Sequence, residues 1–177
     1  SKSIDCVWNG MTLTDEVLNA MTCSQPYISN AQVIVMKADE IENYNTVASF
    51  SDLSFAAEGG SAGEAALQEN ELTSAYSAVS TQADALLEVA SGSSDACVID
   101  ITMAAAMTGE GTSYADLVYS LNLNDAQGLA SEEYGVGFRK GSDMVDAFNV
   151  FWASAVADGS VQETAATYGL QDAVILE

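Results

Sequence analysis

The sequence predicts an α/β fold with largely parallel sheets, and two observations lead to this expectation. Short apolar runs rich in β-branched residues alternate almost throughout with segments whose apolar residues recur at helical spacing. Hydrophobic residues form 49% of the chain of 177 residues, and the mean hydropathy is +0.13. This is enough apolar material for a buried core, so the chain is expected to be globular rather than disordered.

The elements of the first half follow from local signals. A strand is expected at 4–8, where Asn9 and Gly10 end it, and Thr14 is expected to cap a short helix with Asp15 and Glu16 in its first turn. Further elements are predicted as strands at 32–36 and 54–57 and a helix at 64–68. The polar, acidic stretch 37–45 is a candidate lobe boundary or a surface loop.

In the second half, Thr81 is expected to cap a helix that stops at Gly92. The other predicted elements are strands at 75–79, 96–99, 114–123 and 134–139, and helices at 102–107, 144–155 and 160–167. Apolar and aromatic residues of 144–155 fall at helical spacing, which indicates core packing rather than a cofactor site.

Charge excludes several classes of function. There are 26 acidic and four basic residues and no histidine, for a net charge of −22. A protein that neutralises nucleic-acid phosphates needs Lys and Arg, and so does a protein that docks on an anionic membrane. Chemistry that depends on histidine is excluded as well, and no metal or other cofactor is predicted.

Cys6, Cys23 and Cys97 lack the C-x-x-C spacing of metal or redox motifs and are expected to act as small buried hydrophobic residues. A Cys6–Cys23 disulfide is the alternative in an oxidising compartment. No run approaches the ~20 apolar residues of a membrane span. No signal peptide is recognisable, and the abrupt start at Ser1 leads us to expect that something preceded it.

Several motifs, in order along nearly the whole chain, together resemble the amino-acid-type solute-binding proteins of ABC transporters (type II periplasmic-binding-protein fold, family 3). The motifs are Ile4–Glu16, Ser24–Tyr27 with Val33–Val35, Ser51–Leu53, Gly60–Glu64, Asp95–Asp100, Tyr134–Gly141, and Asp158-Gly159 with Tyr168–Leu170.

The resemblance implies two α/β lobes that are joined by two hinge strands and close over a ligand. Residues 1–33 and 134–177 would form lobe one and residues 34–133 lobe two. Lobe one of the family starts well before Ser1, so the chain is interpreted as a C-terminal fragment or one half of a split or processed protein. The implied partners are a small ligand, an amino acid or amine, and an ABC transporter permease at an extracytoplasmic membrane face, periplasmic or on the cell surface.

Gly10, Met11 and Thr12 follow the first predicted strand, where backbone groups and a hydroxyl can face the crevice of an open α/β sheet. In the family this segment holds the ligand, so the resemblance makes all three candidate ligand contacts. The alternative is a turn that merely ends a strand.

The second group of candidate contacts falls in the predicted lobe two. Ser61 and Ala62 begin a helix, whose free N–H groups suit a carboxylate, although such a glycine-rich start is also a common turn. Asp100 follows a buried strand and is either a helix N-cap or, by resemblance, the contact for the ligand ammonium. Glu58 falls where the family selects the ligand side chain, or is a solvated loop residue.

One position departs from the family pattern. An arginine that clamps the ligand carboxylate usually follows the Thr-x-Glu motif, but here Thr14, Asp15 and Glu16 are followed by Val17. Either the helix at Ser61 binds the carboxylate alone, or the ligand is not an ordinary α-amino acid. A cationic ligand suits an acidic site.

The sequence thus favours a solute-binding protein over an enzyme, because a nucleophile paired with a base is not recognisable. Two alternatives stay open. One is a ligand-sensing module of a receptor. The other is a dehydratase-like enzyme on the same scaffold, in which Glu58 and Asp100 would exchange protons with a small acid.

Overall fold

The computed structural model describes residues 3–72, 74–127 and 131–176. It divides into two compact units, which are described separately. Unit 1 comprises Ser1–Asn30 with Glu132–Glu177, and unit 2 comprises Ala31–Ser131. The assignment of lobes from the sequence, at 1–33, 34–133 and 134–177, stays a prediction.

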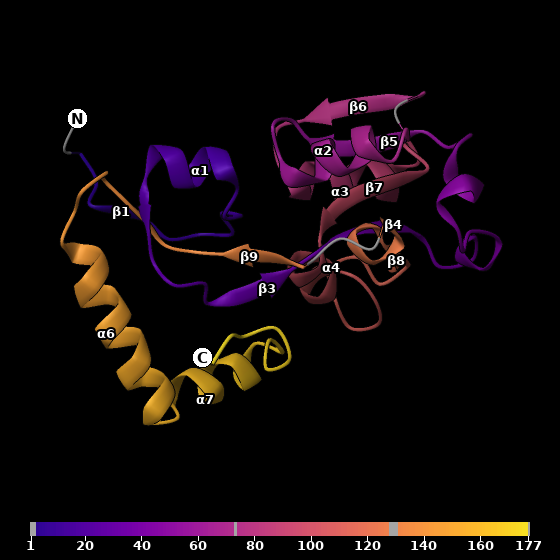
Figure 1. Ribbon diagram of the computed structural model, residues 1–177. Helices are drawn as coiled ribbons and strands as arrows, with labels where there is room; N and C mark the ends of the chain where they lie inside the picture. Colours follow the sequence, from indigo (N-terminus) through magenta and orange to yellow (C-terminus); the bar gives the residue numbers. More distant parts are fainter. Residues whose placement is uncertain (1–2, 73, 128–130, 177) are drawn as a thin grey trace. The chain divides into compact units, whose positions relative to one another are not determined.

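Unit 2 is built on one five-stranded sheet. Its strands, in spatial order, are β6 (Tyr76–Val79), β5 (Phe55–Glu58), β7 (Ala96–Asp100), β4 (Gln32–Lys37) and β8 (Leu117–Asn122) (Figure 1). Strand β5 pairs in parallel with β6 and β7, as the sequence predicts for a strand–helix alternation. Strand β4, however, pairs antiparallel with both β7 and β8, so the sheet is mixed.

Helices cover both faces of this sheet because its strands are apolar on both sides. Alternate residues of β4 belong to two separate cores, Val33 and Val35 to one and Ile34 and Met36 to the other. One core includes side chains of α3 (Gln82–Ser91) and α4 (Ile101–Met107); the other includes side chains of α2 (Ala62–Glu69), α5 (Leu123–Gln127) and the short helix η2 (Val47–Phe50). Unit 2 is therefore a three-layer α/β structure.

Local signals place both ends of α3 correctly. Thr81 caps α3 by accepting from the backbone N–H of Asp84, and Gly92 ends it in a left-handed conformation. The strand expected at 114–123 is shorter, at Leu117–Asn122. The polar stretch 37–45 is a surface loop of unit 2 that contains the short helix η1 (Ile41–Asn43), rather than a boundary.

Unit 1 has two small antiparallel sheets. Strand β10 (Gly137–Phe138) lies between β1 (Cys6–Val7) and β2 (Thr22–Cys23), and β3 (Ile28–Asn30) pairs with β9 (Glu132–Tyr134). The strand expected at 134–139 is thus divided between β9 and β10. The helices of the unit are α1 (Asp15–Ala20), α6 (Met144–Ala157) and α7 (Ser160–Thr167).

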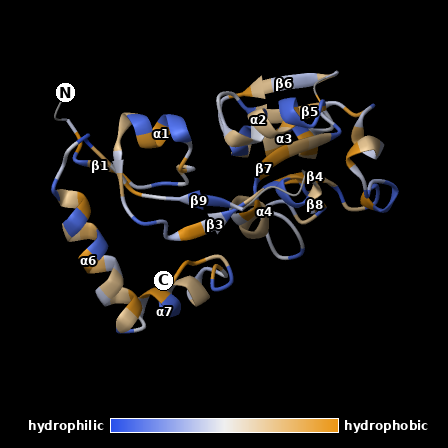
Figure 2. Cartoon of the chain, in the orientation of Figure 1, coloured by the Kyte–Doolittle hydropathy of each residue, from blue (hydrophilic) through white to orange (hydrophobic). Residues whose placement is uncertain are grey.

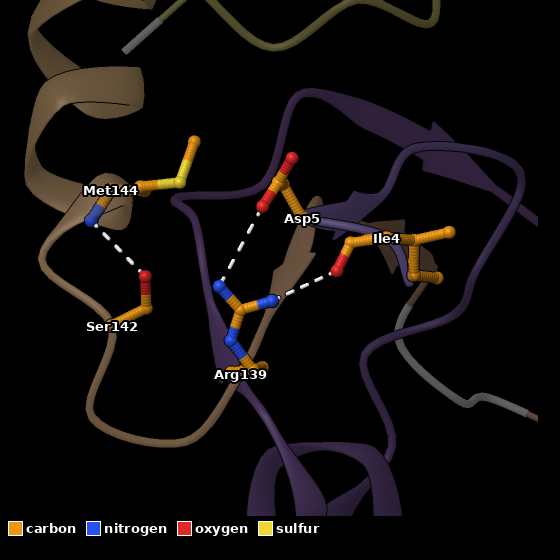
Figure 3. Close-up of polar contacts among 5 residues, drawn as sticks. All are labelled: Ile4, Asp5, Arg139, Ser142 and Met144. Carbon is orange, nitrogen blue, oxygen red and sulfur yellow. Dashed lines mark hydrogen bonds and ion pairs between the residues drawn. The ribbon is translucent and has the colours of Figure 1, made fainter. Parts of the chain in front are cut away.

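Arg139 fastens the start of the chain to the end of β10 (Figure 3). Its Nη1 donates to the carbonyl oxygen of Ile4 at 2.8 Å, and its Nη2 lies 3.6 Å from Oδ1 of Asp5. The neighbouring Lys140 donates from Nζ to the carbonyl oxygens of Leu18 and Asn19, at the end of α1. Both cations therefore serve the local structure of unit 1.

The geometry of unit 1 argues against a Cys6–Cys23 disulfide. Cys6 pairs with Phe138 from one side of β10, and Cys23 pairs with Gly137 from the other. Strands on either side of a shared neighbour are about 9–10 Å apart, whereas a disulfide requires Cα atoms within about 7 Å. All three cysteines are free, and Cys97 is buried as expected. Among the described residues, no helix has the length and apolar character needed to cross a bilayer.

Asp95 gives a testable link between pH and the stability of unit 2. Its Oδ2 accepts from Oγ and N of Ser54, at 2.7 and 2.8 Å, and so ties the start of β7 to the start of β5. These bonds lower the pKa of Asp95 below 3.8. The stabilisation is therefore present above the unfolded pKa and is lost as the pH falls through the folded pKa.

We expect Asp95→Asn to lower the free energy of unfolding at neutral pH and to have a smaller effect as the pH approaches the folded pKa. Urea unfolding of both proteins across this range measures the difference. A constant difference at all pH values would contradict the assignment, because it would show that the charge of Asp95 is not involved.

Candidate functional site

The candidate residues of unit 2 gather at one edge of its sheet. Strands β6, β5 and β7 are parallel, so their carboxyl ends meet at this edge, where ligands bind in open α/β folds. Glu58 ends β5, Asp100 ends β7, and Gln82 follows the end of β6. Because β4 runs the other way, its first residue, Gln32, pairs with Asp100 at the same edge.

The Asp100 carboxylate is held by two side-chain amides. Its Oδ1 accepts from Nε2 of Gln32 at 2.8 Å, and its Oδ2 accepts from Nε2 of Gln82 at 2.5 Å. Oε1 of Gln82 accepts in return from the backbone N–H of Asp100 at 3.0 Å. Asp100 occupies the N-cap position of α4, but its side chain makes no capping bond. The carboxylate is therefore oriented by the two glutamines rather than by the helix.

Gln32 also connects Asp100 to the start of α2. Gln32 is only 1% exposed. A Cβ added at Gly63 would lie 3.1 Å from Oε1 of Gln32 and 3.0 Å from the carbonyl oxygen of Val98. A glycine at position 63 lets the first turn of α2 approach the sheet this closely. Gln32 thus lies between the first turn of α2 and Asp100.

The start of α2 is capped internally. Ser61 accepts from the backbone N–H of Glu64 at 3.1 Å, and Glu64 accepts from the backbone N–H of Gly60 and from the hydroxyl of Tyr76. These bonds lower the pKa of Glu64, while burial and the bond to Glu64 raise the pKa of Tyr76 to about 12. Helix geometry leaves the N–H groups of Ala62 and Gly63 without intrahelical partners, and such groups suit an anion.

Unit 1 carries the segment Gly10–Thr12, which lies along β9. Thr12 forms an isolated bridge with Tyr134, whose ring lies beside Gly10. The hydroxyl of Thr12 donates to Oε2 of Glu132 at 3.4 Å, and the carbonyl oxygen of Met11 accepts from the N–H of Gly135 at 3.3 Å. In this structure the hydroxyl of Thr12 is thus bound within the protein.

Each of the described cations has its place within its own unit. Arg139 and Lys140 bind backbone oxygens of unit 1, and Lys37 ends β4 at the opposite edge of the sheet from Gln32. Val17 lies on α1 of unit 1, where its N–H donates to the hydroxyl of the N-cap, Thr14. Within the described ranges, no group of three or more Cys, Asp or Glu residues could hold a metal ion.

Sequence reasoning missed the amide side chains of the site. Gln32 and Gln82 hold Asp100, and in unit 1 Asn30 donates to Oε2 of Glu132 at 3.0 Å. The only signal for Gln82 was its place directly after a capping Thr81 that follows a strand. The sequence held no signal for Gln32, because a polar residue at the start of an apolar strand is common.

The comparisons with known proteins agree with this architecture. The family model of the bacterial extracellular solute-binding proteins, family 3, matches residues 1–171. Among curated proteins there is no significant match.

Three solved structures illustrate the similarity. A mutant of ArgBP from T. maritima is 26% identical with a TM-score of 0.80, over 94% of this chain and 69% of its own. The ancestral amino acid-binding protein AncCDT-1, a precursor of cyclohexadienyl dehydratase, is 25% identical with a TM-score of 0.81, over 94% and 70%. An ABC uptake transporter substrate binding protein from Streptococcus pneumoniae with bound histidine is 25% identical with a TM-score of 0.77, over 94% and 68%.

The match of the family model to nearly the whole chain and the likeness to these solved structures agree with the α/β architecture described above. This chain belongs to the bacterial extracellular solute-binding proteins of family 3.

Proposed function

We propose that this chain captures a small ligand with an ammonium group, an amino acid or a related amine, and that Asp100 binds that group. The observation that carries the proposal is the Asp100 carboxylate at the carboxyl edge of the sheet, with each oxygen oriented by one amide. A carboxylate oxygen can accept more than one hydrogen bond, so an ammonium can bind beside the amides. ArgBP and the histidine-bound protein from S. pneumoniae support an amino acid as the ligand class.

We further propose that the ligand is cationic. Glu64 already accepts from the backbone N–H of Gly60 at the start of α2, so a negative charge lies close to Ser61 and Ala62, where a ligand carboxylate would bind. Val17 stands in place of the usual arginine, and the net charge is −22. Glu58 is proposed to select a positively charged side chain, and Gly10, Met11 and Thr12 are proposed to contribute backbone and hydroxyl contacts from unit 1.

The same proposal includes delivery of the ligand to an ABC transporter permease at an extracytoplasmic membrane face, with residues 1–33 and 134–177 as lobe one and 34–133 as lobe two. Catalysis is not part of it. The likeness to AncCDT-1, which is described as a binding protein and a precursor of a dehydratase, keeps the dehydratase-like alternative as an outcome to be tested.

Thermal unfolding in the presence of ligands tests the proposal. We expect arginine, lysine and small diamines to raise the midpoint, and acidic amino acids not to do so. A ligand that binds only the folded state adds about 2.7 kcal/mol of stability at a hundredfold excess over its dissociation constant. No shift with any amino acid or amine would overturn the proposal, and turnover of a small acid would favour the enzyme.

A further inference from the structure

Glu132 lies beside the ligand contacts that unit 1 is proposed to contribute, and so far it has no role in the proposed function. Its Oε2 accepts from the hydroxyl of Thr12 at 3.4 Å and from Nδ2 of Asn30 at 3.0 Å. We propose that Glu132 is a specificity-determining residue, whose carboxylate selects a ligand with a guanidinium or ammonium group on its side chain. This inference deepens the proposed function and rests on it, because it takes Gly10–Thr12 as ligand contacts.

The strand register places Glu132 on the same face of unit 1 as Thr12. Asn30 of β3 stands opposite Glu132 of β9, and Thr12 forms an antiparallel bridge with Tyr134, two residues further along β9. Opposite residues of an antiparallel pair point to one face, and so do residues two apart in a strand. The ring of Tyr134 would lie 3.4 Å from a Cβ on Gly10. The carboxylate of Glu132 therefore lies on the surface that carries Gly10 and Thr12.

Strand formation alone does not favour a glutamate at this position. Glu is depleted in strands, yet β9 begins with Glu132 and Glu133 and is hydrophilic (Figure 2). Glu133 is exposed, as a charged strand residue usually is, but Glu132 is half-buried and Asn30 beside it is buried. Burial of a carboxylate costs free energy that hydrogen bonds or a positive charge must offset. Residues that break a local rule in this way are expected at functional sites.

The two donors also orient the carboxylate for a cation. A hydroxyl and an amide hold Oε2 of Glu132, and a carboxylate oxygen can accept more than one hydrogen bond, so a guanidinium or an ammonium can bind the same group. At a half-buried carboxylate the attraction of a cation is stronger than in water. A neutral side chain of the same shape would cover the carboxylate without compensating its charge, and it is therefore rejected.

Arginine and citrulline test the proposal, because citrulline has the same length but carries a neutral ureido group in place of the guanidinium. Isothermal titration calorimetry on the full chain gives both dissociation constants for the unchanged protein and for Glu132→Gln, which keeps one acceptor oxygen for the donors of Thr12 and Asn30. We expect the unchanged chain to bind arginine more tightly than citrulline. We expect E132Q to lose about tenfold in affinity for arginine and less than about twofold for citrulline.

Glu133→Gln is the matched control, because Glu133 is the next residue of β9, is exposed and points to the opposite face. It removes the same charge and should change each affinity by less than about twofold. Glu132→Asp is a second variant that serves if E132Q is too unstable. It withdraws the carboxylate by one methylene and should lower the preference for arginine without abolishing it. Melting without ligand checks the fold of each variant.

The outcomes separate this inference from the proposed function. Equal losses for arginine and citrulline in E132Q would overturn the role of Glu132 alone, because they would show that its side chain supports the structure of unit 1. An undiminished preference for arginine in either Glu132 variant would overturn it as well, and so would an unchanged chain that binds both ligands equally. If neither ligand binds the unchanged chain, the proposed cationic amino acid fails together with this inference.

Discussion

Asp100→Asn is expected to weaken the binding of a cationic amino acid by about 100-fold, or roughly 2.8 kcal/mol. The substitution keeps the shape of the side chain and one acceptor oxygen but removes the charge that would attract the ligand ammonium. It also places an NH₂ group opposite one of the two amide donors, that of Gln32 or that of Gln82, and two donors cannot pair. Isothermal titration calorimetry with the ligand identified by thermal unfolding gives both dissociation constants.

The matched control is Asp39→Asn. Asp39 is exposed and lies two residues after Lys37, the last residue of β4, at the end of the strand opposite to Gln32 and Asp100. Asp39→Asn removes the same charge as Asp100→Asn. Binding by D39N should stay within about twofold of the unchanged chain, because an exposed charge at this distance is screened by salt. Equal losses in both variants would mean that only the overall charge attracts the ligand, and Asp100 would not be its contact.

Gln82 is expected to act through Asp100, since it both donates to the carboxylate and accepts from its backbone N–H. Gln82→Leu should weaken binding by about tenfold in the unchanged chain and very little in the D100N background, because the effects of residues in contact are not additive. Additive losses would show that Gln82 contacts the ligand itself or supports the fold elsewhere. Melting of each variant without ligand separates binding from stability.

Much of the fold could be predicted because its signals are local. The Thr81 cap, the Gly92 stop and the apolar run at 96–99 each depend on neighbours within one turn or strand, and each is found where the sequence predicts it. The position of Asp100 at a strand end followed from the same reasoning. In these cases the residues that determine the structure are neighbours both in the sequence and in space, so the sequence alone reveals them.

The direction of β4 could not be predicted, because pairing direction depends on which distant strands become neighbours. Strand–helix alternation favours parallel pairing, and among the described strands only the pairs β5–β6 and β5–β7 are parallel. The reversal of β4 brings Gln32 to the edge that carries Asp100. The contact between them joins residues 68 positions apart in the chain, so no local pattern could have revealed it.

The partner of Thr12 was hidden for the same reason. Its hydroxyl was expected to face a ligand, but it donates to Glu132, which lies 120 positions further along the chain. The isolated bridge between Thr12 and Tyr134 lies beside this bond. Strands β1 and β2 of unit 1 have only two residues each, too few to show an alternation of apolar and polar side chains. Their pairing is therefore fixed by tertiary contacts rather than by β-strand propensity. The sequence thus predicted unit 2 better than unit 1.

Phe55→Ala is expected to destabilise the protein by about 4 kcal/mol, the usual cost of truncating a buried phenylalanine. Phe55 is 1% exposed and begins β5, where it pairs with Tyr76 of β6 and Ala96 of β7. Its ring belongs to the core that includes Leu67 of α2. Removing the ring leaves a cavity between the sheet and α2, which collapses only in part. Urea unfolding followed by circular dichroism measures the loss.

Leu87→Ala is the matched control, because Leu87 is a large apolar residue of the same unit but is 57% exposed. Its effect should stay within about 0.5 kcal/mol, as for other surface substitutions. Phe55 lies at the opposite end of β5 from Glu58, so Phe55→Ala should leave the ligand affinity of the folded protein unchanged while lowering its stability. A variant that keeps its stability but loses the ligand would contradict this separation, because it would place Phe55 in the binding site rather than in the core.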